Sequence, residues 1–343
     1  MPCPKAPAKV LITGVNGYVG SHVAKNLLER GNTGLRKGVK RLLSAFTCTD
    51  SAILRDNQPK VFDEIIGVGG FDGVAHTAAP IPSSFGLSPS SALKGSFDAV
   101  VEGVVNILGS IKAHGRTVKR VLFASSGLAA SQFKPGIKHN EAHWNDKSLN
   151  IFEEKGDMAL DFERHVASKF LSEKAAWKFV EDNVGKINFD LVAILPTIII
   201  GMPVNENTPL DQLGSSHFLF EALRSPRTDA QLTDAPLSLV YVKYVAAVHS
   251  EAFIQPSAAG HRVIVAGAEP SWQDMYNALN EQPAFLGVTK GNPGLEKRPD
   301  NESEEWDASF AQLLLGRKLI GVKDMIRETA KYYQGAGWKF SQA

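Results

Sequence analysis

The stretch Thr13-Gly14-Val15-Asn16-Gly17-Tyr18-Val19-Gly20 decides the fold of this 343-residue chain. It follows a short β-rich run, Lys9–Thr13, and leads into a segment with a helical spacing of apolar residues, His22–Arg30. A strand that passes through a glycine-rich turn into a helix is typical of the first unit of a parallel sheet with crossover helices. The N-terminal region is therefore predicted to begin such a sheet.

The three glycines of this stretch have different effects on the backbone. Gly14 allows a tight turn, Gly17 lets the backbone approach a pyrophosphate, and Gly20 permits close packing of the helix on the strand. The helix N-terminus offers free N–H groups and a partial positive charge to phosphates. We therefore predict a dinucleotide-binding turn; the alternative is a turn that holds no ligand. The residues predicted to contact the cofactor here are Gly14, Asn16, Gly17, Tyr18, Val19 and Gly20.

Strand-like and helical segments alternate through the first half of the chain. Strands are predicted at 73–76, 120–125 and 189–194, and helices at 99–113 and 169–183. Strands that alternate with helices of this length indicate a parallel sheet covered by helices. The predicted fold class is α/β, a Rossmann doubly wound parallel sheet with a smaller C-terminal lobe for the substrate.

The character of the sequence changes after Gly201. Residues 202–236 and 283–306 are rich in proline and polar residues, which indicates insertions rather than further sheet. We predict a dinucleotide-binding Rossmann domain over 1–195. The mixed region 196–343 is predicted to hold the substrate lobe and segments that return to the Rossmann domain. Within it, strands are predicted at 237–242 and 261–266, and helices at 271–281 and 322–334.

Composition limits the classes of partner. Lys and Arg number 37 against 36 Asp and Glu, a formal net charge of +1. This balance argues against a nucleic-acid or anionic-membrane partner, since both need a basic surplus. The two cysteines, Cys3 and Cys48, have no metal or redox spacing, and the N-terminus has no apolar segment typical of a secretion signal. We expect a cytoplasmic monomer or homodimer that acts on a small-molecule substrate.

A cluster of cations stands at the expected end of the second strand. Arg36, Lys37, Lys40 and Arg41 occupy the region where an NAD site has an acidic residue for the ribose 2′-hydroxyl. Cations there suit a 2′-phosphate, so the predicted cofactor is NADP(H), bound in part by Arg36 and Lys40. The alternative is a solvated basic start of a helix.

Several motifs along nearly the whole chain resemble one enzyme family. They are Thr13–Gly20, His76-Thr77-Ala78-Ala79-Pro80, Arg120–Ser126, Ser168-Lys169, Glu173-Lys174-Ala175-Ala176-Trp177 and Pro196-Thr197. Together they resemble the extended short-chain dehydrogenase/reductase family, in the branch of the dihydroflavonol reductases and methylglyoxal (ketone) reductases. The resemblance implies an NADP-dependent oxidoreductase acting on a small carbonyl or hydroxyl compound, with secondary metabolism as a natural setting.

The resemblance also implies roles for individual residues. Ser126 matches the serine that holds the substrate carbonyl, and Lys169 matches the lysine that binds the nicotinamide ribose. His165 falls on the position of the catalytic tyrosine, in His-Val-Ala-Ser-Lys where the family has Tyr-x-x-x-Lys. The implied catalytic residues are thus Ser126, His165 and Lys169. Further residues implied to line the cofactor are Thr77, Ala78, Pro196 and Thr197.

Histidine in place of tyrosine changes the acid–base chemistry of the site. The family's tyrosine protonates the alkoxide that forms on hydride addition, and the cationic lysine lowers its pKa from about 10. Histidine starts at about 6.5, and the charge of Lys169 lowers that pKa further. We therefore expect His165 to be neutral at pH 7, a donor of one N–H bond that is better suited to moving protons as a base.

Three functions remain open on these residues. The first is an NADP(H)-dependent reductase whose redox competence depends on how His165 substitutes for tyrosine. The second is a non-redox isomerase, dehydratase or cyclase in which His165 transfers protons. The third is a catalytically inactive NADPH-binding protein. No metal is expected: His139 and His143 are four residues apart but lack the H-E-x-x-H order and a third ligand.

Overall fold

The computed structural model describes residues 8–30, 60, 62–79, 96–134, 136–156, 159–235, 237–295, 304–319 and 321–341. The predicted cation cluster, with Arg36 and Lys40, lies outside these residues. Within them, no helix is long and apolar enough to cross a membrane.

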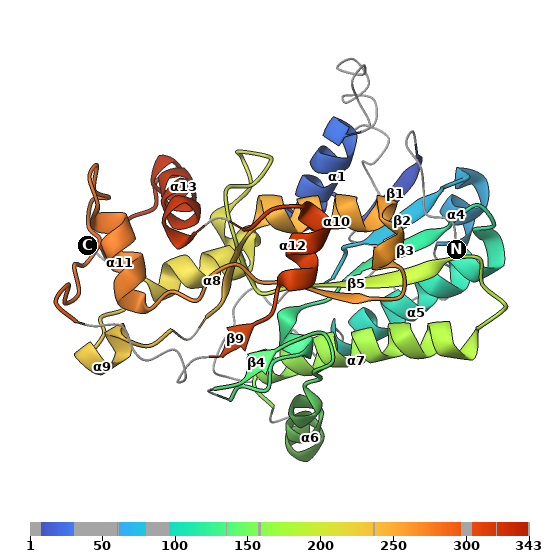
Figure 1. The fold of residues 1–343 in the computed structure, drawn as a ribbon, viewed down its shortest axis with the longest axis horizontal. Helices are drawn as coiled ribbons and strands as arrows, with labels where there is room; N and C mark the ends of the chain where they lie inside the picture. Colours follow the sequence, from blue (N-terminus) through green and yellow to red (C-terminus); the bar gives the residue numbers. More distant parts are fainter. Residues whose placement is uncertain are drawn as a thin grey trace.

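A parallel sheet forms the centre of the molecule (Figure 1). Its described strands lie in the order β1 (Val10–Thr13), β2 (Gly73–His76), β3 (Arg120–Ala124), β5 (Asp190–Pro196) and β8 (Arg262–Val265). Every neighbouring pair is parallel, and Thr13, His76 and Phe123 lie side by side in the register. The carboxyl ends of β1, β2 and β3 therefore end at one edge. The predicted α/β fold with a parallel sheet is confirmed.

Helices cover both faces of the sheet (Figure 1). On one face lie α4 (Asp63–Gly69), α5 (Ser96–His114) and α7 (Asp161–Asp182); on the other lie α1 (Tyr18–Arg30) and α10 (Val242–Ile254). Successive strand residues point to opposite faces, so Leu11 packs in the first layer and Ile12 in the second. Both faces of a parallel sheet are buried in this way, which explains the continuous apolar runs in its strands.

The C-terminal part adds a group of shorter elements at one end of the sheet (Figure 1). Two short strands, β6 (Ile198–Ile200) and β7 (Leu239–Tyr241), pair in parallel there. The helices of this part are α8 (Ser215–Ala222), α9 (Asp229–Leu232), α11 (Trp272–Asn280) and α13 (Val322–Gly335). The 3-10 turns within the described ranges are η2 (Gly127–Ala129), η4 (Leu210–Leu213) and η5 (Pro256–Ala258).

A second connection joins the C-terminal part to the main sheet region. The short strand β9 (Glu305–Trp306) pairs in parallel with β4 (Lys138–His139). Glu304, directly before β9, accepts hydrogen bonds from His139 Nε2 at 2.9 Å, from Ser131 Oγ at 3.0 Å and from the Lys134 amide at 3.1 Å. Two further helices in the part of the chain that the structure describes are α6 (Asp146–Lys155) and α12 (Ser309–Leu315).

The sequence prediction was wrong about several boundaries. The helix predicted from residue 169 begins two turns earlier, at Asp161, where Glu163 accepts a hydrogen bond from the Leu160 amide at 2.9 Å. The strand predicted at 237–242 is shorter, and residue 242 already begins α10. The 202–236 insertion contains two short helices, and α6 and α10 were not predicted.

Candidate functional site

The glycine turn between β1 and α1 is tightly closed. Gly14 has a φ of +70°, a conformation that favours glycine, and its carbonyl accepts a hydrogen bond from the Gly17 amide at 2.9 Å. A Cβ added to Gly14 would lie 2.8 Å from the backbone of Ala78, and one added to Gly20 would overlap the Gly14 carbonyl. The turn therefore requires glycine at both positions, as the spacing indicates.

The outer side of this turn suits a phosphate group. Asn16 and Gly17 are exposed directly before α1 begins, and the start of a helix favours the negative charge of a phosphate. Val19 is half-buried against the core. The Tyr18 side chain points the other way, because its hydroxyl donates to the Gly201 carbonyl at 2.7 Å. Any contact of Tyr18 with a dinucleotide would thus involve its backbone.

Thr13 joins the ends of β1 and β2 beneath the turn. Its hydroxyl lies 2.8 Å from His76 Nδ1 and accepts from the Ala78 amide at 3.3 Å. The Thr77 hydroxyl donates to the Thr13 carbonyl at 2.6 Å. Thr77 and Ala78 are therefore held directly against the Gly14–Gly20 turn, on the same edge of the sheet.

The turn that follows Ser126 lies beside two other segments that carry predicted site residues. Ser126 follows β3, and its hydroxyl accepts from the Leu128 amide at 3.2 Å, which caps the turn η2. A Cβ on Gly127 would lie 3.3 Å from both the Pro196 carbonyl and Thr197 Cγ2. The η2 turn packs against α7, the helix of His165 and Lys169. Ser126, the Pro196–Thr197 segment and α7 thus meet at the carboxyl ends of β3 and β5.

Burial sets the protonation of this cluster. His165 and Lys169 are four residues apart and therefore share a face of α7. Burial lowers the pKa of Lys169 to about 8. Burial first, and the charge of Lys169 second, lower the pKa of His165 to about 3 and that of His76 to about 4. Both imidazoles are therefore neutral at pH 7 while Lys169 is largely a cation. The direction matches the sequence prediction, but burial is the larger cause.

Thr197 carries a polar atom that the described residues do not satisfy. Its Oγ1 is buried and has no hydrogen-bond partner among them. Buried hydroxyls are normally paired, so such an atom at the end of β5 suggests a partner outside the protein. Together with the closed glycine turn, it shows that the residues present fit a dinucleotide along this edge.

Two features near this cluster were not predicted from the sequence. The ring tip of Trp306 reaches Gly127, where an added Cβ would lie 3.3 Å from Trp306 Cη2. Phe133 has a φ of +49°, is 52% exposed, and lies edge-on to Phe162 of α7 with ring centroids 6.0 Å apart. A β-strand of two residues and a strained aromatic have no periodic pattern, so no sequence signal identified them.

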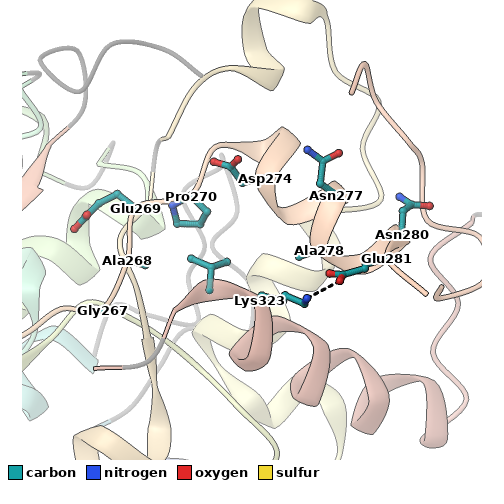
Figure 2. A pocket seen from close by; sticks show the side chains of 11 residues that line it. Gly267, Ala268, Glu269, Pro270, Asp274, Asn277, Ala278, Asn280, Glu281 and Lys323 are labelled. Carbon is teal, nitrogen blue, oxygen red and sulfur yellow. Dashed lines mark hydrogen bonds and ion pairs between the residues drawn. The ribbon is translucent and has the colours of Figure 1, made fainter. Parts of the chain in front are cut away.

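A separate hollow lies in the C-terminal part, between α11 and α13 (Figure 2). It has a volume of about 910 Å³, and Asp274, Asn277 and Asn280 are among the residues that line it. At one end Lys323 Nζ and Glu281 Oε1 form an ion pair at 2.6 Å. None of the predicted site residues lines it. Among the described residues, no group of three His, Cys, Asp or Glu side chains could hold a metal ion.

Comparison with known proteins identifies the family. Residues 10–149 match the NAD dependent epimerase/dehydratase family. The chain is 30% identical over 285 residues to a ketoreductase of Penicillium roqueforti, covering 79% of this chain and 80% of that one. It is 28% identical to an NADPH-dependent methylglyoxal reductase of Saccharomyces cerevisiae, covering 94% of this chain and 96% of the yeast protein.

Solved structures agree on the fold. The yeast methylglyoxal/isovaleraldehyde reductase complexed with NADPH superposes with a TM-score of 0.76 at 24% identity, covering 96% of this chain and 99% of that one. A Candida albicans relative in complex with NADPH gives a TM-score of 0.79 at 21% identity, over 96% and 99% of the two chains. The chain belongs to the NAD dependent epimerase/dehydratase family, the extended short-chain dehydrogenases/reductases.

Proposed function

We propose that this protein is an NADPH-dependent reductase of a small carbonyl compound. The observation that carries the proposal is that the turn after Ser126 packs both on the Pro196–Thr197 segment and on α7, the helix that holds His165 and Lys169. Relatives named as methylglyoxal reductase and ketoreductase support the choice of a carbonyl substrate. Secondary metabolism is a setting suggested by the family branch alone.

The proposed cofactor site runs along the carboxyl edge of the sheet. The Gly14–Gly20 turn would hold the pyrophosphate, with Thr77 and Ala78 beside it. Pro196, Thr197 and Lys169 would hold the nicotinamide end, where the Thr197 hydroxyl has its free hydrogen-bonding capacity. NADPH, when bound, supplies the hydride. The preference for NADP(H) over NAD(H) rests on the cations Arg36 and Lys40 and their neighbours in the sequence.

Without the tyrosine, the proton must come from another group. A neutral His165 can donate an N–H bond to the carbonyl oxygen and stabilise the developing negative charge, as neutral imidazoles do in other enzymes. It is a poor source of the proton. The pKa of about 3 describes the imidazolium, which is hardly populated at pH 7, and the neutral ring holds its remaining N–H proton tightly. Lys169 has a pKa of about 8, close to the operating pH, which suits a general acid. We infer that Ser126 and His165 donate hydrogen bonds to the carbonyl oxygen and that Lys169 donates the proton to the alkoxide.

The non-redox alternative is weaker on the same geometry. An isomerase, dehydratase or cyclase would use neutral His165 as the base. A histidine with a pKa of about 3 is a weak base, since the buried site opposes the imidazolium that proton abstraction creates. A catalytically inactive NADPH-binding protein is the other alternative, and only turnover separates it from a reductase.

The proposal is tested by titrating the purified protein with NADPH and then screening carbonyl substrates, starting with methylglyoxal and isovaleraldehyde. Binding with oxidation of NADPH supports the reductase. Binding without turnover on any ketone or aldehyde favours the inactive protein, and absence of NADPH binding favours the non-redox enzyme.

Cofactor preference has its own test. The double substitution of Lys40→Ala and Arg41→Ala should weaken NADPH binding by about 10-fold or more, which is the effect of losing one charge-assisted hydrogen bond to the phosphate. It should leave NADH binding nearly unchanged, because NADH has no 2′-phosphate. Equal losses for both cofactors would mean that these cations do not contact the 2′-phosphate. Isothermal titration with both cofactors measures this directly.

A further inference from the structure

A fully buried carboxylate lies behind the candidate site. Glu173 of α7 is 0% exposed, and its two oxygens accept four hydrogen bonds. Oε2 accepts from Ser125 Oγ at 2.7 Å and from Arg262 Nη2 at 3.3 Å. Oε1 accepts from Arg262 Nε at 2.7 Å and from Trp177 Nε1 at 3.2 Å. The charge is thus compensated by a buried arginine, as a buried ion needs.

The partners of Glu173 come from the elements that carry the proposed catalytic residues. Ser125 directly precedes Ser126 at the end of β3. Glu173 lies one helical turn after Lys169, and both are buried on α7. A single carboxylate therefore connects the backbone that positions Ser126 to the helix that positions Lys169 and His165.

The arginine that holds this carboxylate is itself fixed. Arg262, at the start of β8, donates through Nη1 to the carbonyls of Glu141 and His143. Its guanidinium lies 3.7 Å from the centroid of the Trp144 ring, and Lys174 Nζ lies 3.8 Å from the same centroid. Contacts of cations with an aromatic ring at these distances are favourable. Glu173 is therefore anchored to β8 and to the 141–144 segment.

We propose that Glu173 is a positioning residue that sets the distance between Ser126, which would bind the substrate carbonyl, and the α7 residues His165 and Lys169. Nothing in the geometry brings Glu173 to the substrate; it acts through Ser125 on one side and through its own helix on the other. The inference rests on the proposed reductase function for its catalytic meaning. Misplacement of reacting groups by about 1 Å reduces rates by up to about 100-fold, so a loosened link should be measurable.

The first test is Ser125→Ala, which removes the 2.7 Å link and leaves the Glu173–Arg262 ion pair intact. We expect kcat for methylglyoxal reduction to fall about 10-fold, with the NADPH dissociation constant changed less than twofold. The isotope effect measured with NADPH deuterated at the transferred position should rise, because hydride transfer becomes slower. The matched control is Ser250→Ala, which removes a buried hydroxyl bonded within its own helix at 3.2 Å and should change none of these.

A second test uses Glu173→Gln and the double variant with Ser125→Ala. If both act through one contact, the effect of Ser125→Ala on kcat/KM should be smaller in the Glu173→Gln background. Unchanged kcat and isotope effect in Ser125→Ala, with wild-type turnover present, would overturn the proposal. So would fully additive losses. Should Glu173→Gln fail to fold, Ser125→Ala alone decides.

Hydrogen–deuterium exchange separates this inference from the reductase assignment. In Ser125→Ala the amides of 125–130 should exchange faster than in the wild type, and in Ser250→Ala they should not. A wild-type protein that turns over no carbonyl would overturn the proposed function, while faster exchange in Ser125→Ala would still support the link. Wild-type exchange of 125–130 in Ser125→Ala would overturn the link whatever the turnover.

Discussion

His165 stands where the family places a phenol, and its substitution by tyrosine is the most direct test of the site. His165→Tyr should restore a general acid next to Lys169 and raise carbonyl reduction, by up to the 10²–10⁴-fold that a well-placed acid contributes. Loss of the native turnover in this variant would instead indicate a site adapted to proton transfer without hydride transfer. Unchanged turnover would make His165 a bystander. Steady-state kinetics on the best carbonyl of the screen decide among these outcomes.

Lys169 gives the site its pH dependence. Burial lowers its pKa to about 8, so it loses its proton as the pH rises through that value. If Lys169 delivers the proton, kcat/KM should be level from pH 6 to 7.5 and fall towards a tenfold loss per pH unit above about 8. His165, with a pKa of about 3, should add no inflection between pH 5 and 7. A rate that rises between pH 5.5 and 7.5 would contradict a His165 that is neutral at pH 7.

At the scale of elements, the glycine turn offers the sharpest prediction. Gly14→Ala forces a Cβ into a φ of +70° and to within 2.8 Å of the Ala78 backbone. We expect a loss of about 1–2 kcal/mol in the free energy of unfolding from the left-handed conformation alone, and NADPH binding weakened at least 10-fold because the turn must shift. Chemical denaturation and fluorescence titration measure the two effects.

The control for Gly14→Ala is Gly70→Ala. Gly70 ends α4 with a φ of +55°, and a Cβ there would meet nothing within 4 Å. The substitution should therefore lower stability through the same backbone strain but leave NADPH affinity unchanged. Equal effects of both substitutions on NADPH binding would mean that the Gly14 turn does not contact the dinucleotide.

How well the elements could be predicted depended on how much of each one repeats a pattern. β1, β2, β3 and α5 were found because buried strands and amphipathic helices carry apolar residues at a regular spacing. The start of α7 was missed because its first residues carry no regular apolar stripe. The helix begins at Asp161, where the Glu163 side chain accepts a hydrogen bond from the Leu160 amide. The pair β4–β9 has two residues per strand, too few for a period, and it depends on the distant Glu304 carboxylate.

The same limit applies to the candidate site. Glycine spacing and family motifs predicted that Gly14 and Ser126 follow strands that end at one edge of the sheet, because parallel strands end together, and that Lys169 lies on a helix. Burial could not be inferred from neighbouring residues, yet it dominates the pKa of His165 and Lys169. Long-range contacts such as Ser125 with Glu173 were equally invisible in the sequence.

At the scale of the whole molecule, the two halves share one core. The layer that packs Ile12 and Val192 of the sheet continues into Phe220 and Tyr333 of the C-terminal part. The Tyr18 hydroxyl adds a direct hydrogen bond from the glycine turn to Gly201, where the C-terminal elements begin. The division at 195/196 remains a prediction about folding units, and this continuous packing leads us to expect a single cooperative unfolding transition.

Stability should fall in acid because several histidines are buried neutral. Burial lowers the pKa of His22, His76 and His249 to about 4 each, whereas unfolded histidine titrates at about 6.5. Between those values the unfolded chain binds more protons than the folded one, so stability decreases as the pH falls, by up to about 1.4 kcal/mol per pH unit for each site. The melting temperature should be nearly level from pH 7 to 7.5 and drop steeply from 6.5 to 4. His249→Gln, inside α10, should make that slope shallower. A slope unaffected by His249→Gln would show that this imidazole does not stay neutral when buried.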